Sequence, residues 1–234
     1  MVTNVPRREA PVRREGVYNL KGKRLASVTE VAGGLAKPHL LKWGAKVAVQ
    51  AVFDDPHRYD TLEEAVGAID AVVKAAAMRG RAVHSLVEAW ARGQEVPDPE
   101  DEALQGYWRA WLSFVQSWKP VARFAEAVVV NWTHGYAGRM DLGATMGTEE
   151  WVIDAKTAKA VYPEYPLQLK AYFNAEEMSL DGGLTFQPMP KFDKMGIVLL
   201  DAKGTFNLTQ VNGDFEAFLH LLKLWEWKKE NVAW

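Results

Sequence analysis

The sequence contains no cysteine among its 234 residues. This absence excludes disulfide bonds, thiolate-bound zinc, iron–sulfur clusters held by cysteine, and thiol nucleophiles. Any metal ion that the protein binds must therefore be held by oxygen and nitrogen atoms.

Long apolar runs are also absent. No stretch reaches the roughly 18 apolar residues of a membrane-spanning helix, and the N-terminus lacks the apolar segment of a signal peptide. We therefore expect no membrane insertion, no export, and a cytoplasmic location. The P-loop pattern G-x-x-x-x-G-K-[ST] is missing as well, which argues against a nucleotide-driven motor.

An excess of charge of either sign is lacking. The formal net charge is -2, with 48% hydrophobic and 25% charged residues. This composition is typical of a globular chain and predicts one α/β domain with an N-terminal extension. The small net charge argues against a protein that coats polyanions with its whole surface, but it does not bear on a local groove.

Basic residues are nevertheless concentrated at the N-terminus. Seven of them fall within the first 24 residues, against only Glu9 and Glu15. We expect residues 1–24 to be a flexible basic arm, followed by a single domain over residues 25–234. Two interpretations of the arm stay open: it contacts a phosphate backbone, or it is a solvated tail. The seven basic residues are Arg7, Arg8, Arg13, Arg14, Lys21, Lys23 and Arg24.

Helical patterns fill residues 25–118. Ser27-x-x-Glu30 and Thr61-x-x-Glu64 match capping boxes, which mark helix starts. We expect helices near 28–35, 38–50, 62–78, from about 80 through "RAVHSLVEAW", and near 100–118. The aromatic residues of the last helix follow helical spacing, which predicts a buried face rather than a base-stacking platform. The apolar positions of that helix are Leu104, Trp108, Trp111, Val115 and Trp118.

After Pro120 the apolar period changes to two. The stretch "RFAEAVVVN", residues 123–131, places Phe124, Glu126 and Val128 on one face of a predicted strand. A glutamate is costly to bury on such a strand without a partner. It either belongs to an acidic site or forms a strand-end salt bridge with Arg123 or Arg139.

The stretch "GRMDLGATMGTEEWVIDAKTAK", residues 138–159, predicts two strands joined by a turn at 147–150. The turn brings Asp141 near Asp154, and the strand period of two places Asp154 and Lys156 on the same face. Neighbouring carboxylates repel each other unless a cation lies between them, and Mg²⁺ or Mn²⁺ suits oxygen ligands of this kind. The alternative is an exposed hairpin on which Lys156 forms a surface salt bridge.

The remaining elements complete an α/β pattern. "PEYPLQLKAYFNAEEM" has helical spacing, with Gln168 and Tyr172 one turn apart on the same face. "MGIVLLD" and "TFNLTQV" predict a second pair of strands, and residues 214–230 predict a closing amphipathic helix. The catalytic core is expected over about residues 80–211.

Five of these pieces, in this order, resemble the PD-(D/E)XK nuclease superfamily. They are "GRAVH", "FAEAVVV", "GRMD", "DAKTAK" and "QLKAY". Together they are most similar to the RecB-type branch, which includes CRISPR-associated and phage exonucleases. "SVTEV" and "KPHLLKWGAK" resemble more loosely the opening of phage-encoded members. The resemblance implies a restriction-endonuclease-like α/β core, with a mixed central sheet flanked by helices and a helical N-terminal region.

The resemblance also implies a metal site. His84, Asp141, Asp154 and the backbone carbonyl of Ala155 would bind Mg²⁺ or Mn²⁺. Without the surrounding motif, His84 would instead be a helical residue paired with Glu88. Many relatives hold an iron–sulfur cluster through four cysteines, and this cysteine-free chain must fold without one.

Further residues receive roles through the same resemblance. Lys156 would position the attacking water and offset charge on the transition state, and Glu126 would orient a water or hold a second metal ion. Gln168 and Tyr172 would support Lys156 and the DNA strand by hydrogen bonds. The alternative for Gln168 and Tyr172 is a buried polar pair on a packed helix.

The implied function is a divalent-metal-dependent DNA exonuclease of the phage or prophage recombination and repair type. The implied partners are DNA ends or single strands and a recombination or single-strand-binding protein, in the cytoplasm of an infected or lysogenic bacterium. Three other functions stay open: a structure-specific endonuclease of the same fold, an inactive DNA-binding protein, and a phosphoesterase acting on nucleotides. The sequence leaves the oligomeric state open.

Overall fold

A computed structural model describes residues 16–35, 37–55 and 57–231. The chain divides into two compact units, one formed by Met1–Gly34 with Val83–Trp234 and the other by Leu35–Ala82. The single domain expected over residues 25–234 stays a prediction. Helix α3 (Leu62–Ala91) contributes to both units, and the two units are described in turn.

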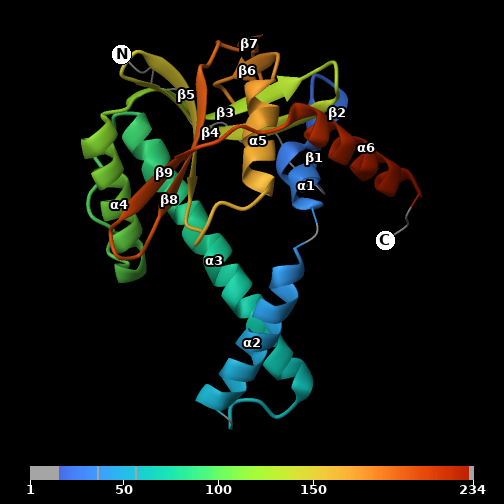
Figure 1. Cartoon of the computed structure of the whole chain (residues 1–234), viewed down its shortest axis with the longest axis vertical. Helices are drawn as coiled ribbons and strands as arrows, with labels where there is room; N and C mark the ends of the chain where they lie inside the picture. Colours follow the sequence, from blue (N-terminus) through green and yellow to red (C-terminus); the bar gives the residue numbers. More distant parts are fainter. Residues whose placement is uncertain (1–15, 36, 56, 232–234) are drawn as a thin grey trace. The chain divides into compact units, whose positions relative to one another are not determined.

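A mixed sheet forms the centre of the larger unit (Figure 1). The strand order is β7-β6-β3-β4-β5-β8-β9, β2 pairs with β4, and β1 pairs with β2. The β5–β8 and β2–β4 pairs are parallel and the others are antiparallel. The strands are β1 (Val17–Leu20), β2 (Lys23–Ser27), β3 (Val121–Asn131), β4 (Tyr136–Met146), β5 (Glu149–Lys156), β6 (Glu177–Ser179), β7 (Gln187–Pro188), β8 (Lys194–Leu200) and β9 (Phe206–Gln210).

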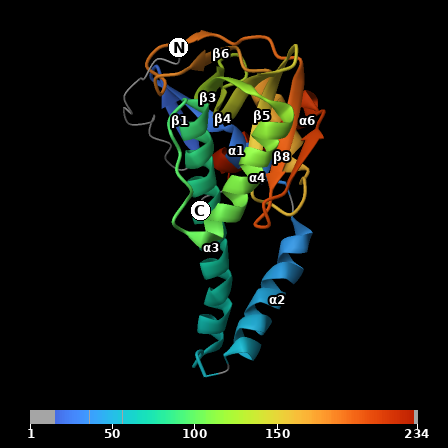
Figure 2. The ribbon, with the colours of Figure 1, turned by 90° about the vertical axis from the view of Figure 1, so that its left-hand side faces the viewer.

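Helices cover both faces of this sheet (Figures 1 and 2). Helices α1 (Val28–Gly33), α5 (Glu164–Phe173) and α6 (Phe215–Asn231) enclose a first core on one face. The end of α3 and α4 (Glu102–Trp118) enclose a second core on the other face. The expected α/β class, with a mixed central sheet flanked by helices and helices preceding the main strands, is confirmed. None of the described helices is long and apolar enough to cross a membrane.

The aromatic residues of α4 supply much of the second core. Trp108 and Trp111 are buried, as expected from their helical spacing, and Phe114 is buried beside them. Trp118 differs, because 45% of it is exposed at the end of the helix.

Strand β3 does not keep the regular alternation that the sequence predicts. Glu126 has a φ of +53°, a left-handed conformation that is uncommon for a residue with a side chain. As a result Phe124 packs with the first core, on the side of Ala127 and Val129, while Ala125 packs with the second core. The expected shared face of Phe124, Glu126 and Val128 is therefore wrong: a backbone kink at Glu126 reverses the pattern.

Strand β4 exchanges partners along one edge. Its first residues, Tyr136 and Ala137, pair with β2, whereas Leu142 to Met146 pair with β5. Residues 138–141 lie between these two pairings. Met140 packs with the first core and Leu142 with the second, so the strand changes orientation at Asp141.

The N-terminal region differs from the flexible arm expected over residues 1–24. Residues 1–15 lie outside the described part of the chain, but β1 and β2 form an antiparallel hairpin. This hairpin buries Leu20 and Leu25 against Val128 and Val130 in a third core. The ordered fold therefore begins before residue 24, because the hairpin side chains are needed to cover β3.

The helix starts were predicted with mixed success. At Thr61 the hydroxyl accepts a hydrogen bond from the Glu64 N–H at 3.2 Å, as a capping box requires. Ser27 is the N-cap of α1 but makes no side-chain capping bond, so the box predicted there is not formed. The helices expected at 62–78 and from about 80 are one continuous helix, α3, because Gly80 is accommodated in its interior.

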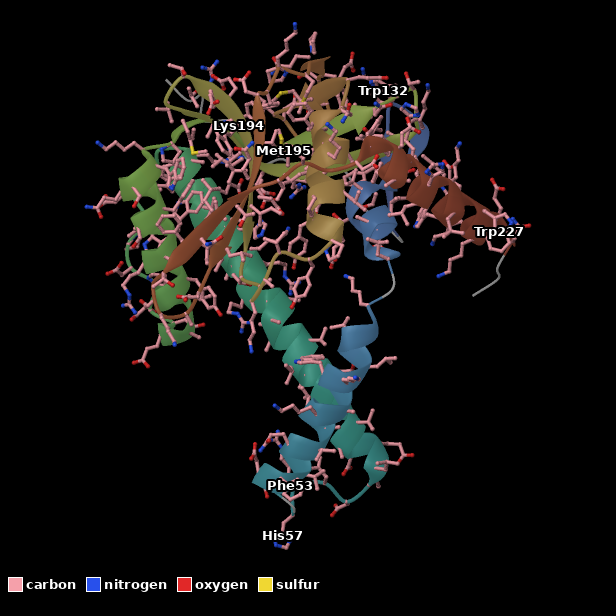
Figure 3. All side chains as sticks on the ribbon, viewed as in Figure 1. Phe53, His57, Trp132, Lys194, Met195 and Trp227 are labelled. Carbon is pink, nitrogen blue, oxygen red and sulfur yellow. The ribbon has the colours of Figure 1, made fainter. Side chains whose placement is uncertain are left out.

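The smaller unit is a helical hairpin of α2 (Pro38–Asp54) and the first part of α3. The two helices approach closely where Gly44 faces Ile69: a Cβ added to Gly44 would lie 3.4 Å from the Ile69 Cδ1. Among the described residues of this unit, only Gly44 and Ala65 are buried. Phe53 and His57, near its turn, are exposed (Figure 3).

Candidate active site

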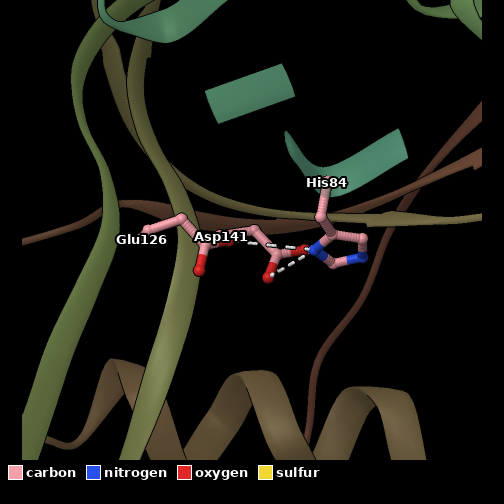
Figure 4. A group of neighbouring side chains, drawn as sticks. All are labelled: His84, Glu126 and Asp141. Atoms are coloured by element: carbon pink, nitrogen blue, oxygen red, sulfur yellow. Dashed lines mark ion pairs between the residues drawn. The ribbon is translucent and has the colours of Figure 1, made fainter. Parts of the chain in front are cut away.

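His84, Glu126 and Asp141 converge from α3, β3 and β4 (Figure 4). The His84 Nδ1 lies 3.3 Å from the Asp141 Oδ1 and 3.9 Å from the Glu126 Oε1. One potential ligand atom from each residue falls within 4.8 Å of the others. Three potential metal ligands that are far apart in the sequence thus share one location.

The position of His84 follows from the packing of α3. Val83 and Val87 are buried in the second core and fix the helix over the sheet. His84 contacts the acidic cluster, while Glu88 pairs with Arg92 at 2.9 Å. His84 therefore contacts Asp141 and Glu126, which the sequence-based alternative of a pair with Glu88 does not include.

The kink at Glu126 directs its carboxylate into this cluster. The same carboxylate pairs with Arg139, whose Nη1 lies 3.4 Å from Glu126 Oε2. Arg123, the other candidate partner, instead pairs with Glu150. Both interpretations of Glu126 thus apply at once: it is a member of the cluster and one side of a salt bridge. Left-handed backbone at a non-glycine residue is costly and is often retained at functional sites.

Asp154 and Lys156 project from the same face of β5, as the strand period predicts. The Lys156 Nζ lies 2.8 Å from both carboxylate oxygens of Asp154 and donates a hydrogen bond to Oδ1. The buried Asp154 Oδ2 accepts no hydrogen bond within the described part of the chain. Lys156 is itself mostly buried, so the alternative of an exposed surface salt bridge does not describe it.

Asp141 lies beside these residues. Its Oδ2 accepts a hydrogen bond from the Ala155 N–H at 3.1 Å, and its charge and hydrogen bonding act on the Asp154 carboxyl. Pairing between β4 and β5 ends at Leu142 and Ile153, so the two aspartates lie at the point where the strands cease to pair. The predicted proximity of Asp141 to Asp154 is therefore present in the structure.

The charges of these groups depend on one another. The Asp141 carboxylate raises the pKa of His84 to about 11 against the effect of burial. Burial opposes ionisation of Asp141, but the charge of His84 and its hydrogen bond hold the pKa of that carboxyl well below its usual value. Burial raises the pKa of Asp154 to about 7; the nearby Asp141 adds to the increase and Lys156 opposes it.

Lys156 remains an ammonium ion at neutral pH. Burial favours its neutral form, but Asp154 and Asp141 outweigh burial and raise its pKa above the ordinary value. A cation and at least one carboxylate anion are therefore held together beneath the surface.

Helix α5 contributes the expected pair of Gln168 and Tyr172. The Gln168 Nε2 donates a hydrogen bond to the Tyr172 Oη at 2.8 Å, and both side chains are buried. This geometry matches the alternative of a buried polar pair. Their support of Lys156 and of a DNA strand stays a prediction.

Sequence analysis missed Tyr165, which also lies on α5. The Lys156 Nζ lies 5.1 Å from the centre of the Tyr165 ring, within range of a cation–π interaction. Tyr162 packs edge-on against this ring at 5.6 Å. The available signal was spacing, because Tyr165 precedes Gln168 by three residues and so shares its side of the helix.

Comparisons with known proteins give distant likenesses among solved structures. No protein-family model matches the chain, and no curated protein matches it. Among solved structures, it is similar to an alkaline exonuclease, LHK-Exo, from Laribacter hongkongensis, with a TM-score of 0.37 and 12% sequence identity over 88% of this chain and 92% of that one. A likeness of this size does not place the chain in a family, so the proposals below rest on its own residues.

Proposed function

We propose that this protein is a divalent-metal-dependent DNA exonuclease that hydrolyses phosphodiester bonds. The observation that carries the proposal is the convergence of five ionisable side chains where β4 and β5 cease to pair. A histidine, three carboxylates and an ammonium ion meet there: His84, Glu126, Asp141, Asp154 and Lys156.

The residues present fit a divalent metal ion. One ligand atom each from His84, Glu126 and Asp141 lies within 4.8 Å of the others, close enough for one ion to contact all three. The Asp154 Oδ2 is buried beside the Lys156 ammonium and accepts no hydrogen bond in the described part of the chain. Carboxylate oxygens with one imidazole suit Mg²⁺ or Mn²⁺, and the absence of cysteine excludes an iron–sulfur cluster bound through thiolates.

In this proposal His84, Asp141, Asp154 and the Ala155 carbonyl hold the metal ion. When bound, the ion would polarise a phosphoryl oxygen and lower the pKa of a coordinated water. Glu126, held by Arg139, would orient that water or a second ion.

Lys156 would act as a fixed cation. Its raised pKa makes it a poor proton acceptor, so we assign it to positioning the nucleophilic water and offsetting charge on the phosphate. Asp154 and the Tyr165 ring both lie within interaction distance of the ammonium group. The hydrogen bond between Gln168 and Tyr172 would hold α5 in position next to Lys156.

The proposed substrate is DNA with a free end. A role in phage or prophage recombination, in the bacterial cytoplasm and beside a recombination or single-strand-binding protein, belongs to the same proposal.

The test is digestion of end-labelled linear duplex, linear single strands and covalently closed circles with Mg²⁺ or Mn²⁺. We expect ladders from linear DNA and intact circles. Cleaved circles would indicate an endonuclease, and binding without cleavage an inactive DNA-binding protein. Hydrolysis of free nucleotides that excess DNA does not inhibit would indicate a phosphoesterase.

Substitutions test the site in the same assay. Asp141→Asn, Asp154→Asn and Lys156→Ala should each slow cleavage by at least about 10²–10³, the typical cost of losing one group that stabilises the transition state electrostatically. The control is Lys159→Ala, which alters an exposed lysine three residues after Lys156 and should leave the rate unchanged. Circular dichroism would verify folding. Near-normal turnover by any of the three site variants would refute the assignment.

A further inference from the structure

The α2–α3 hairpin of residues 35–82 exposes an unusual amount of apolar surface. Eighteen large apolar side chains are exposed among the described residues, and eleven of them lie in this hairpin. They are Leu40, Leu41, Trp43, Val49, Val52, Phe53, Leu62, Val66, Val72, Val73 and Met78. An exposed apolar surface on this scale is typical of an interaction site.

The hairpin does not enclose a core of its own. Helices that are apolar around most of their circumference are normally buried, yet only Gly44 and Ala65 are buried here among the described residues of the hairpin. A two-helix unit of this size cannot bury enough surface to be stable by itself. Its apolar faces therefore require a covering partner.

Charge is separated along the length of the hairpin. Gly44 on α2 faces Ile69 on α3, so residues 35–46 and residues 67–82 form the open end of the hairpin, away from the turn. The open end carries six lysines and arginines against Asp70 alone, and Lys42, Lys46 and Lys74 are exposed.

The turn end, residues 47–66, has the opposite charge. It carries five carboxylates against Arg58 alone. All five carboxylate residues are exposed: Asp54, Asp55, Asp60, Glu63 and Glu64. An apolar surface with a basic end and an acidic end is complementary to a copy of itself turned end for end.

We propose that the hairpin is a self-association element. Two copies pair antiparallel about a two-fold axis, so that four helices enclose a shared apolar core and the acidic turn end of each hairpin lies against the basic open end of the other. DNA is a poorer occupant because the five carboxylates would repel phosphates. An unrelated protein would not explain why the hairpin carries both halves of the charge pattern.

The first test is the mass of the full-length protein in solution, by light scattering after size exclusion. We expect twice the chain mass of 26.2 kDa. Leu41→Asp with Phe53→Asp, at side chains 79% and 77% exposed, should return the mass to that of the monomer. Trp227→Asp is the matched control, because Trp227 is 57% exposed but lies on α6 (Figure 3). A monomeric wild type, or a dimer that survives the double substitution, would overturn the proposal.

Charge reversal tests the orientation without altering the apolar surface. Lys42→Glu with Lys46→Glu should weaken the dimer by at least about tenfold, because like charges then meet across the interface. Adding Glu63→Lys and Glu64→Lys to the same chain should restore the affinity. If the fourfold variant is as weak as the double variant, the antiparallel pairing is wrong.

Single cysteines report the same geometry, since the chain has none of its own. Pyrene attached at Val49→Cys, close to the boundary between the open end and the turn end, should give excimer emission when two copies meet. Pyrene at His57→Cys, near the turn, should give none, because the two turns lie at opposite ends of the pair. Excimer emission from both positions would indicate a parallel arrangement and would contradict the proposal.

Discussion

The His84 imidazole and the Asp141 carboxylate stabilise each other's charged forms. Because the pKa of His84 is raised to about 11 and that of Asp141 is lowered, the ion pair contributes to stability in full between the ordinary carboxyl value of 3.8 and the ordinary histidine value of 6.5. Its contribution is lost as pH rises through 11, and also as pH falls from 3.8 toward the lowered pKa of Asp141. In the metal-free protein His84 is thus protonated at neutral pH. A metal ion must displace that proton, because only neutral imidazole binds metal.

Mn²⁺ binding near pH 7 should therefore release about one proton or more. His84 would give up its proton, and Asp154, with a pKa raised to about 7, would give up the fraction it still holds. Metal affinity should rise as pH increases through the neutral range. Titration calorimetry in two buffers of different ionisation enthalpy measures the number of protons released.

A histidine control separates this effect from general titration. His84→Asn should reduce proton release to the share of Asp154, whereas His220→Asn, at an exposed position on α6, should leave it unchanged. A binding heat that is the same in both buffers would mean that His84 is not a ligand.

At the residue scale, simple periodicity predicted part of the site. The strand period of two placed Asp154 and Lys156 side by side, and the turn at 147–150 brought Asp141 opposite them. The strand period of two could not predict the left-handed backbone of Glu126. Glutamate does not favour that conformation by itself, so the surrounding structure must impose it. The contact of Tyr165 with Lys156 was also missed, because its helix could be predicted but not its docking.

Among the secondary-structure elements, α5 positions the site by packing closely on β4. Gly138 on β4 leaves room for the Tyr172 ring, since a Cβ added there would lie 2.4 Å from the Tyr172 Cε1. Tyr172 cannot easily move away, because it is buried and accepts the hydrogen bond of Gln168. The glycine therefore sets the distance between α5 and the stretch of β4 that ends in Asp141.

Gly138→Ala should lower the free energy of unfolding by about 1–3 kcal/mol, the usual cost of overpacking a filled core. Gly33→Ala, where an added Cβ meets nothing within 4 Å, should change it by no more than about 0.5 kcal/mol. Urea unfolding of the two variants beside the wild type would measure the difference. Equal stability of the two variants would show that Tyr172 does not depend on the glycine.

Element types were more predictable than element boundaries. The strands from β3 to β5 and helices α4 to α6 follow clear apolar periods, and the structure contains them close to the expected residues. A glycine that breaks a helix and a glycine tolerated inside one look alike in sequence, so α3 was predicted as two helices. The β1–β2 hairpin was missed because its many basic residues resemble those of an exposed arm.

The whole molecule combines two units with opposite characters. The larger unit encloses three apolar cores, and its polar cluster lies where β4 and β5 cease to pair. The smaller unit is an open hairpin whose apolar residues are mostly exposed. A stable sheet that holds reactive groups and a surface suited to self-association are thus encoded in separate parts of one chain.

The N-terminal region should divide into a DNA-contacting part and a structural part. Removing residues 1–15 deletes Arg7, Arg8, Arg13 and Arg14 but leaves the β1–β2 hairpin intact. If these arginines contact phosphates, this truncation should keep cleavage, weaken binding of all DNA sequences alike, and reduce the slope of log affinity against log salt by about 0.9 per lost contact.

Removing residues 1–24 should instead unfold the larger unit. This longer truncation deletes all of β1, with the buried Tyr18 and Leu20, and exposes the part of β3 that they cover. Anisotropy of labelled DNA in Ca²⁺, between about 50 and 200 mM salt, would measure the slopes, and circular dichroism would measure folding. An unchanged slope for the protein lacking residues 1–15 would show that these residues do not contribute to DNA binding. If the protein lacking residues 1–24 stays folded, the contribution of Tyr18 and Leu20 to the third core is dispensable.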